Sequence, residues 1–294
     1  MRTLAVIVTH NRESLLQRAV FHLKQQTVKL DEILVVNNGS TDNTSYILEK
    51  LNVSNVSQEN VGSAGGWHTG ISYALKNNFD YCWLMDDDGF PARNAFQLLQ
   101  DNFPKDFSCL SSIVVREDQN EKLVFPMPRL NADGHPSLSI LKRKLSRVCE
   151  LDTDPIYPFA HFFNGALISM KAAREVGNIN RDYFIMGDEV DYFYRLKSFG
   201  PVGTLIESKH FHPDVTNRPY SQTKIYYLLK NTIINHQKYM NLPLVRSLAL
   251  IPVVLLRTLL RNGPSFLFLF LLNKDFIFFK ALQRGFKGNL AKDL

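Results

Sequence analysis

The chain has 294 residues, of which 45% are hydrophobic and 21% charged, so it can fold around one large core or two modest ones. Its three cysteines, Cys82, Cys109 and Cys149, are widely spaced and match no metal-ligand pattern, which argues against a disulfide framework and for a reducing compartment. The net charge of +6 comes from residues 242–294, with eight basic and two acidic residues, whereas residues 1–241 are neutral; no nucleic-acid partner is expected.

Apolar runs alternate with helical patterns in the first third of the chain. LAVIV (4–8) is followed by apolar residues at helical spacing in 13–26, and EILVV (32–36) by a helix from about Asn43. A further helix, from about Gly65 to Asn78, leads into YCWLM (81–85). This alternation predicts a parallel, doubly wound α/β sheet. Because ligands bind beyond the carboxyl ends of such strands, the polar turns THNRE, NNGSTDN and DDDGF should converge on one site.

The later part of the chain should extend the sheet. We expect strands at 109–115, 162–169 and 203–211, with a helix at about 188–198 between the last two. Residues 116–158, which include the basic cluster LKRKLSR, show no firm pattern. We interpret them as a surface excursion or an acceptor loop.

Three consecutive carboxylates, Asp86, Asp87 and Asp88, close the third apolar strand. Adjacent ionised carboxylates repel one another unless a cation or hydrogen-bond donors compensate them. In an extended segment Asp86 and Asp88 project to one side, where they could hold Mg²⁺ or Mn²⁺ beside a diphosphate. Asp87 would point away and could meet the nucleotide. A solvated acidic turn is the simpler alternative.

Three glycines lie in the stretch 60–67, just before the third helix. Without side chains they would let a ligand approach the backbone, and the amides of a helix start can receive an anion. Ordinary turns explain glycines equally well. Earlier in the chain, Asn38 could offer its amide to a base or ribose, whereas Ser40 and Asp42 are equally well explained as helix caps.

A second acidic group, GDEVD (187–191), opens the helix near residue 188. Acidic residues in a first turn are favoured by the helix dipole whatever their function. A carboxylate facing a diphosphate site could also accept the proton of an attacking hydroxyl. Beyond this helix, His210 and His212 share one face of a predicted strand, so either could be a third metal ligand or a structural histidine.

The order of the motifs NNGSTD, NVGSAGG, WLMDDDGFP, FFNGALIS, GDEVD and HFH resembles the family 2 glycosyltransferases over roughly residues 3–236. GSAGGW followed by WLMDDDG is most similar to the bacterial galactofuranosyltransferase and rhamnosyltransferase branch, which builds O-antigens of lipopolysaccharide, capsules and other cell-wall glycans. The resemblance implies a GT-A fold, with a Rossmann-like, doubly wound, mostly parallel sheet. It implies a catalytic domain over 1–238, with a nucleotide-binding half at about 1–115 and an acceptor half at about 116–238, followed by a tail at 239–294.

The resemblance also implies a set of site residues. The general base would be Glu189, at the second position of the carboxylate pair, with Asp188 as its rival because the family usually has Asp at that position. The metal, Mn²⁺ or Mg²⁺, would bind Asp86, Asp88 and His212, the last matching the family's histidine better than His210. The nucleotide or donor would contact Thr9, Arg12, Asn38, Asn60, Gly62, Gly65, Gly66, Trp67, Asp86 and Asp87. The acceptor would contact Trp67, Asn164, Gly165 and Asp191.

The implied reaction is an inverting, metal-dependent transfer from a nucleotide-diphosphate sugar to a glycan or lipid-linked glycan. UDP-galactofuranose is the first-choice donor, with dTDP-rhamnose or a UDP-hexopyranose as alternatives. A non-catalytic nucleotide-sugar binding protein would need no base. A metal-dependent phosphohydrolase would need no acceptor.

The apolar tail segments 242–260 and 266–279 contain uncharged runs of ten residues between Arg246 and Arg257 and twelve between Arg261 and Lys274. These runs are shorter than the ~20 residues of a transmembrane helix. We therefore expect basic amphipathic helices lying in the membrane interface, on a cytoplasmic protein peripheral to the inner face of the cytoplasmic membrane. A buried helical pair or a homo-oligomer interface is the alternative.

Overall fold

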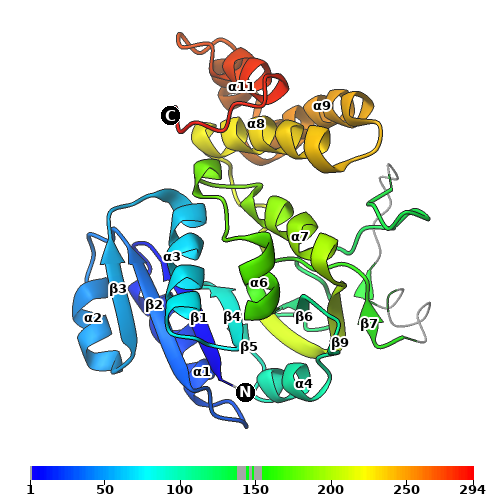
Figure 1. The fold of residues 1–294 in the computed structure, drawn as a ribbon. Helices are drawn as coiled ribbons and strands as arrows, with labels where there is room; N and C mark the ends of the chain where they lie inside the picture. The colour runs from blue at the N-terminus through cyan, green and yellow to red at the C-terminus, as the bar shows by residue number, and fades with distance from the viewer. Residues whose placement is uncertain (1, 138–143, 146–147, 149–153) are drawn as a thin grey trace.

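The computed structural model describes residues 2–137, 144–145, 148 and 154–294, so Cys149 and most of the LKRKLSR cluster lie outside the described residues. Its described strands form one nine-stranded mixed sheet (Figure 1). The strands are β1 (Thr3–Thr9), β2 (Glu32–Asn38), β3 (Ser54–Gln58), β4 (Tyr81–Asp86), β5 (Phe90–Pro91), β6 (Cys109–Arg116), β7 (Ile156–Tyr157), β8 (Asn164–Ser169) and β9 (Val202–His212).

The sheet order is β3-β2-β1-β4-β8-β6-β9-β5, with β7 paired to β9. Strands β3, β2, β1 and β4 run parallel, β8 is antiparallel to β4 and β6, and β6 runs parallel to β9. The predicted α/β class and mostly parallel sheet are confirmed. The short polar edge strand β3 was not predicted, because SNVSQ lacks an apolar run. The strand order reverses between β1 and β4, which places their carboxyl ends side by side at a topological switch point.

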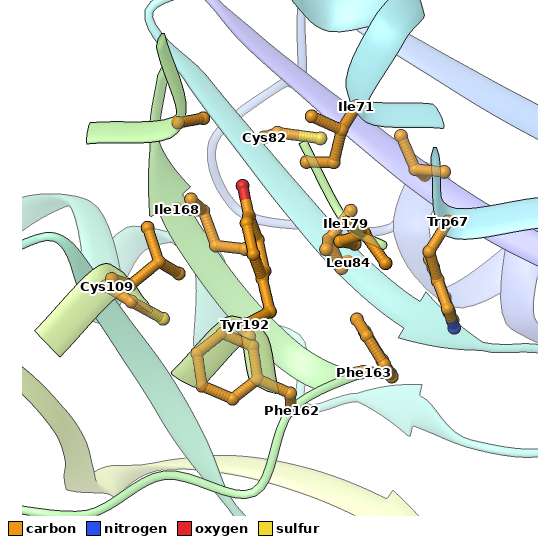
Figure 2. Close-up of a cluster of buried hydrophobic side chains, with 14 of the residues drawn as sticks. Trp67, Ile71, Cys82, Leu84, Cys109, Phe162, Phe163, Ile168, Ile179 and Tyr192 are labelled. Carbon is orange, nitrogen blue, oxygen red and sulfur yellow. The ribbon is translucent and has the colours of Figure 1, made fainter. Parts of the chain in front are cut away.

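Helices cover both faces of the sheet, which explains why its central strands are continuously apolar. One face packs under α3, α6 and α7, and the other under α1 and α4. Figure 2 shows the first of these two cores, in which Trp67 and Tyr192 lie among aliphatic and aromatic side chains. The helices are α1 (Glu13–Lys24), α2 (Thr44–Leu51), α3 (Gly62–Lys76), α4 (Ala95–Asp101), α6 (Met170–Val176), the 3-10 helix η1 (Arg181–Tyr183) and α7 (Asp188–Phe199).

A separate helical layer follows the sheet and lies at one end of the molecule (Figure 1). It contains α8 (Gln222–Tyr239), α9 (Pro243–Asn262), α10 (Pro264–Leu271) and α11 (Ile277–Phe286). Buried side chains of α8 such as Ile225 and Leu229 share a core with Val254 of α9 and Phe278 of α11. Helix α8 therefore packs with the helices that follow residue 238.

Helix α9 is, within the described residues, long and apolar enough to cross a membrane by length and composition alone. Most of it is exposed, and one face packs on the layer's core through Val254 and Thr258. The apolar side chains on its other face contact no other part of the described chain closely enough to be buried.

Candidate functional site

The triple aspartate lies at the switch point, where β4 ends at Asp86 and the chain turns. Thr9 Oγ1, at the end of β1, donates a 2.7 Å hydrogen bond to Asp87 Oδ2. Arg12 Nη1 pairs with Asp87 Oδ1 at 2.8 Å and with Asp88 Oδ2 at 2.9 Å. The structure thus brings Thr9 and Arg12 together with the acidic turn. Because the chain turns after Asp86, side chains no longer alternate between the two faces of a strand beyond it. Asp87 and Asp88 therefore both contact the guanidinium of Arg12.

Two further cationic side chains contact Asp88. His212 Nε2, at the end of β9, lies 3.0 Å from Asp88 Oδ1, and Arg218 Nη1 lies 3.5 Å from Asp88 Oδ2. Burial opposes ionisation of Asp88, but the hydrogen bond and charge of His212, with Arg12 and Arg218, hold the pKa of Asp88 well below its usual range. Burial likewise opposes protonation of His212, yet Asp88 raises the pKa of its imidazole. A buried hydrogen bond joins the two side chains.

His210, by contrast, lies inside the protein. It is fully buried, and neither ring nitrogen has a hydrogen-bond partner among the described residues. Burial lowers its pKa to about 3, so the ring is neutral. It packs against Gly89, where a Cβ would lie 2.3 Å from His210 Nε2. Of the two candidate histidines, His212 is the one in contact with the triple aspartate.

Asp86 and Asp188 are carboxyl groups whose surroundings disfavour the ionised form. Burial, and then the carboxylates of Asp88 and Asp87, raise the pKa of Asp86 well above its usual value. Asp188 opens α7; burial, the neighbouring Glu189 and the more distant Asp86 raise its pKa. Its Oδ2 is buried and has no hydrogen-bond partner in the described part of the chain. The influence of Asp86 on the pKa of Asp188 indicates that the end of β4 and the start of α7 lie near one another.

A divalent cation suits this donor set. No group of three or more His, Cys, Asp or Glu side chains in the described ranges is already assembled at metal-binding spacing. Carboxylate oxygens of Asp86 and Asp88 and the imidazole of His212 are nevertheless ligands that Mn²⁺ and Mg²⁺ accept. The nearby Asp188 Oδ2, buried and without a hydrogen-bond partner among the described residues, is a polar atom whose ionised form such an ion would favour.

Asn38, expected to offer its amide to the nucleotide, uses that amide within the protein. Its Oδ1 accepts hydrogen bonds from Gln58 Nε2 at 2.9 Å and Val61 N at 3.3 Å. Its Nδ2 donates to Gly62 O at 3.0 Å and lies 3.4 Å from Asn60 Oδ1. The side chain is nearly fully buried. Asn38 therefore shapes the segment before α3, because its donors and acceptor already have partners.

The three glycines lie inside the first turns of α3, which begins at Gly62 and not at Gly65. Gly62 has φ +77, and a Cβ there would lie 2.1 Å from Phe184 O. Ala64 N donates to this same oxygen at 3.1 Å. A Cβ at Gly66 would lie 2.5 Å from Val8 Cγ1. The glycines thus allow α3 to approach β1 and the segment before α7, and the Ala64 amide serves the protein itself.

Trp67 is placed differently from the expectation that it contacts a sugar. Its side chain is fully buried and stacks on Phe163, with ring centroids 4.4 Å apart (Figure 2). Trp67 is a core residue because α3 covers the ends of β1 and β4, and the large apolar ring packs between the helix and the sheet. In this arrangement the Trp67 side chain presents no surface to a ligand.

The other residues expected on the acceptor side fall in two places. Asn164 and Gly165 lie in β8 next to β4, and Asn164 Oδ1 is buried without a hydrogen-bond partner among the described residues. Asp191 lies one turn into α7. It accepts from Tyr239 OH at 2.7 Å and Arg195 Nε at 2.9 Å, so it joins α7 to α8. The structure does not bring Asp191 into contact with the triple aspartate.

Several polar residues at this site were missed by the sequence analysis. Arg18 Nη2 donates to Asp88 O at 2.8 Å. The exposed His10 ring donates through Nδ1 to Asn38 O at 3.0 Å. Burial lowers the pKa of Lys224, as do the nearby charges of Arg218 and Arg261. Of these residues, only His10 could have been found from a local motif, because it lies in the polar turn THNRE. The basic residues come from helices and a loop that carry no motif of their own.

Comparisons with known proteins address the family and the fold. The profile described as "Glycosyl transferase family 2" matches residues 4–167. The chain is 31% identical over 223 residues to the galactofuranosyltransferase GlfT1 of Mycolicibacterium smegmatis, a match that covers 71% of this chain and 70% of that protein.

Two solved structures share the fold. A mannosyltransferase of Pyrobaculum calidifontis, in complex with GDP-Man and Mn²⁺, superposes with a TM-score of 0.55 at 15% identity over 98% of this chain and 85% of its own. GalNAc-T7 with UDP, GalNAc and Mn²⁺ gives a TM-score of 0.57 at 16% identity over 80% and 48% of the two chains. The GT-A fold expected from the sequence is confirmed.

Proposed function

This chain belongs to glycosyltransferase family 2, and we propose that it transfers galactofuranose from UDP-galactofuranose to a glycan or lipid-linked glycan of a bacterial surface polysaccharide. One observation carries the proposal. At the switch point, Thr9, Arg12 and His212 converge on the triple aspartate, and the acidic start of α7 faces the same place. This arrangement provides a cation and phosphate site next to carboxylates that can accept a proton. The similarity to GlfT1 supports the choice of donor.

The donor diphosphate would bind between the acidic turn and the surrounding cations. Arg12 and Arg218 both contact Asp88 Oδ2, and Lys224 lies near Arg218. Arginine side chains favour phosphate oxygens because their N–H groups can donate two parallel hydrogen bonds. We expect Arg218, which is about half exposed, to turn from Asp88 to a phosphate when the donor binds. The exposed His10 ring, next to Asn60, would line the nucleoside end.

The transfer would be a single in-line displacement with inversion. Glu189 takes the proton of the acceptor hydroxyl. The oxygen of that hydroxyl forms a bond to the anomeric carbon as the bond from this carbon to the diphosphate breaks. Glu189 is the more accessible carboxylate of the pair, whereas Asp188 is nearly fully buried. Asp86, Asp88 and His212 would hold Mn²⁺ or Mg²⁺, which when bound neutralises charge on the departing diphosphate.

A donor panel with and without acceptor tests this function. The full chain is incubated with UDP-galactofuranose, dTDP-rhamnose and UDP-hexopyranoses, with Mn²⁺ or EDTA, and with a panel of synthetic glycan acceptors. We expect transfer from UDP-galactofuranose only when both metal and acceptor are present. Transfer from another donor would reject galactofuranose but not the glycosyltransferase chemistry. Donor hydrolysis without acceptor dependence would indicate the phosphohydrolase alternative, and binding without turnover a non-catalytic nucleotide-sugar binding protein.

We further propose that the C-terminal layer attaches this cytoplasmic enzyme to the inner face of the cytoplasmic membrane. The exposed surface of α9 and α10 carries large apolar side chains, including Leu256, Leu260 and Phe268. Basic residues such as Arg257 and Lys274 are exposed on the same layer. Apolar side chains between cations favour the interface of an anionic lipid bilayer. One face of α9 packs on the layer's core, which supports a position along the membrane surface. A homo-oligomer interface is the competing explanation.

A further inference from the structure

The segment between η1 and α7 has a strained backbone. Phe184 has φ 62 and ψ −69, Met186 has φ 62, and Gly187 has φ 90. For a side chain other than glycine, a positive φ costs on the order of 1 kcal/mol or more. The next residue, Asp188, is the first of α7. This turn, residues 183–187, therefore sets where the helix begins and where its two carboxylates point.

One buried side chain of α8 holds most of this turn. Asn231 is fully buried, and its Nδ2 lies 3.0 Å from Tyr183 O, 3.0 Å from Ile185 O and 2.7 Å from Met186 O. An amide group has two hydrogens to donate, so these three carbonyl oxygens share them. The positive φ angles of Phe184 and Met186 turn these three carbonyl groups toward the same side chain. Asn231 thus compensates for the strain with hydrogen bonds.

A second asparagine, one helical turn further along α8, holds the end of the turn. Asn235 Nδ2 donates to Gly187 O at 2.8 Å, and Asn235 Oδ1 accepts from Tyr183 OH at 2.5 Å. Gly187 O also accepts the first intrahelical bond of α7, from Asp191 N at 3.0 Å. Asn235 therefore contacts the carbonyl at which α7 starts. Residues 231 and 235 lie on the same face of α8.

We propose that Asn231 and Asn235 are positioning residues for the transfer reaction: they hold the turn 183–187 so that Asp188 and Glu189 face the triple aspartate. This inference rests on the proposed function, because it assigns the α7 carboxylates a role in the chemistry. Within the described residues, neither asparagine forms a hydrogen bond with those carboxylates or with the triple aspartate. Their effect is exerted through the backbone, and a displacement of about 1 Å at a reacting group can cost ~10²-fold in rate.

The test compares Asn231→Ala and Asn235→Ala with Gln26→Ala. Gln26 is a matched control because it is a nearly buried amide that makes three hydrogen bonds to backbone atoms, at His22, Ala92 and Phe96, away from this turn. All three variants should lose stability. We expect only the two asparagine variants to lose about 10-fold or more in kcat with the donor KM unchanged. Their amides in residues 183–191 should also exchange faster with deuterium, while those of β1 and β4 stay protected.

Each outcome decides one of the two proposals. If the asparagine variants keep kcat at the level of Gln26→Ala, or lose donor affinity in proportion to kcat, the positioning role is wrong. If the unmodified chain transfers no sugar from any donor, the proposed function fails, and hydrogen exchange alone then tests whether these side chains hold the turn. Unchanged exchange in 183–191 overturns the inference whatever the activity.

Discussion

Asp188 and Glu189 are neighbours in sequence with different surroundings. Asp188 is nearly fully buried, and its pKa is raised by burial and by other carboxylates, so its protonated form is favoured. Glu189 is half-buried, and its Oε2 accepts a 2.7 Å hydrogen bond from Gly187 N. A general base must be ionised and must reach the acceptor hydroxyl. These surroundings favour Glu189 as the base and give Asp188 a part in shaping the charge beside Asp86.

We predict that Glu189→Gln lowers kcat by about 10²–10⁴-fold and leaves donor binding intact, since a general base contributes that much. Asp188→Asn, which keeps the shape of a protonated carboxyl, should lower kcat far less. Steady-state kinetics and calorimetric donor binding on both variants would measure this. A larger loss in Asp188→Asn than in Glu189→Gln would assign the base to Asp188.

Two glycines with similar φ angles allow the cost of backbone strain to be distinguished from the cost of a steric clash. Gly62 and Gly177 have φ +77 and +79, but an added Cβ meets Phe184 O at 2.1 Å in the first case and nothing within 4 Å in the second. Gly177→Ala should cost about 1–3 kcal/mol through the backbone alone, because φ 79 with ψ 176 is a conformation that essentially only glycine adopts. Gly62→Ala should cost clearly more and should lower activity, because α3 and the turn before α7 must separate. Denaturant unfolding of both variants checks this; equal losses would mean that the Phe184 contact gives way easily.

At the scale of elements, α8 joins the site to the C-terminal layer. One face carries Asn231 and Asn235 toward the turn before α7, and another packs against α9 and α11. His236 lies at the contact with α9, where its Nδ1 is 3.2 Å from Ser247 Oγ. Burial, and then the charge of Arg246, lower the pKa of His236 to about 4. The folded layer therefore requires a neutral imidazole at this contact.

This lowered pKa predicts acid sensitivity of the layer. The unfolded chain binds a proton at His236 near pH 6.5, while the folded chain does so only near pH 4. The stabilisation is therefore present above pH 6.5 and lost as the pH falls toward 4. His236→Gln, which cannot titrate, should show a smaller drop in Tm between pH 7.5 and pH 5 than the unmodified chain. Equal drops in the two proteins would exclude His236 as a source of the sensitivity.

At the scale of the whole molecule, charge and exposed apolar surface are concentrated at one end. Residues 1–241 have a balanced charge, whereas residues 242–294, which include α9 to α11 in the layer beyond the sheet, carry the basic surplus (Figure 1). Leu260 is 76% exposed and Phe268 63%. Several large apolar side chains exposed together indicate an interaction surface.

We predict that the full chain sediments with vesicles containing anionic lipid, less so with zwitterionic vesicles, and less at high salt. Leu256→Gln combined with Leu260→Gln should reduce binding strongly, because each removes apolar surface from the interface. Phe21→Gln, at an exposed aromatic residue of α1 in the sheet domain, is the control and should bind normally. A concentration-dependent dimer without vesicle binding would support the homo-oligomer alternative.

The sequence by itself determined the fold class, the family and the position of the acidic turn. Continuous apolar runs such as 4–8 and 81–85 indicate strands covered on both faces, and alternating helices make the sheet parallel. The triple aspartate must then lie at the carboxyl end of a strand. The fold class and the acidic turn needed only local periodicity and residue chemistry, which tertiary packing did not override, whereas the family came from the resemblance in the order of the motifs.

The tertiary structure alone decided which side chains meet. Trp67 and Asn38 were expected to bind ligand, yet one stacks in the core and the other bonds to the segment before α3. Arg218 meets Asp88, and Asn231 meets the turn before α7, across long separations in sequence. A residue type states what a side chain can bond to, but only the packing of distant segments fixes its partner, because burial makes each polar group bond to whatever lies next to it.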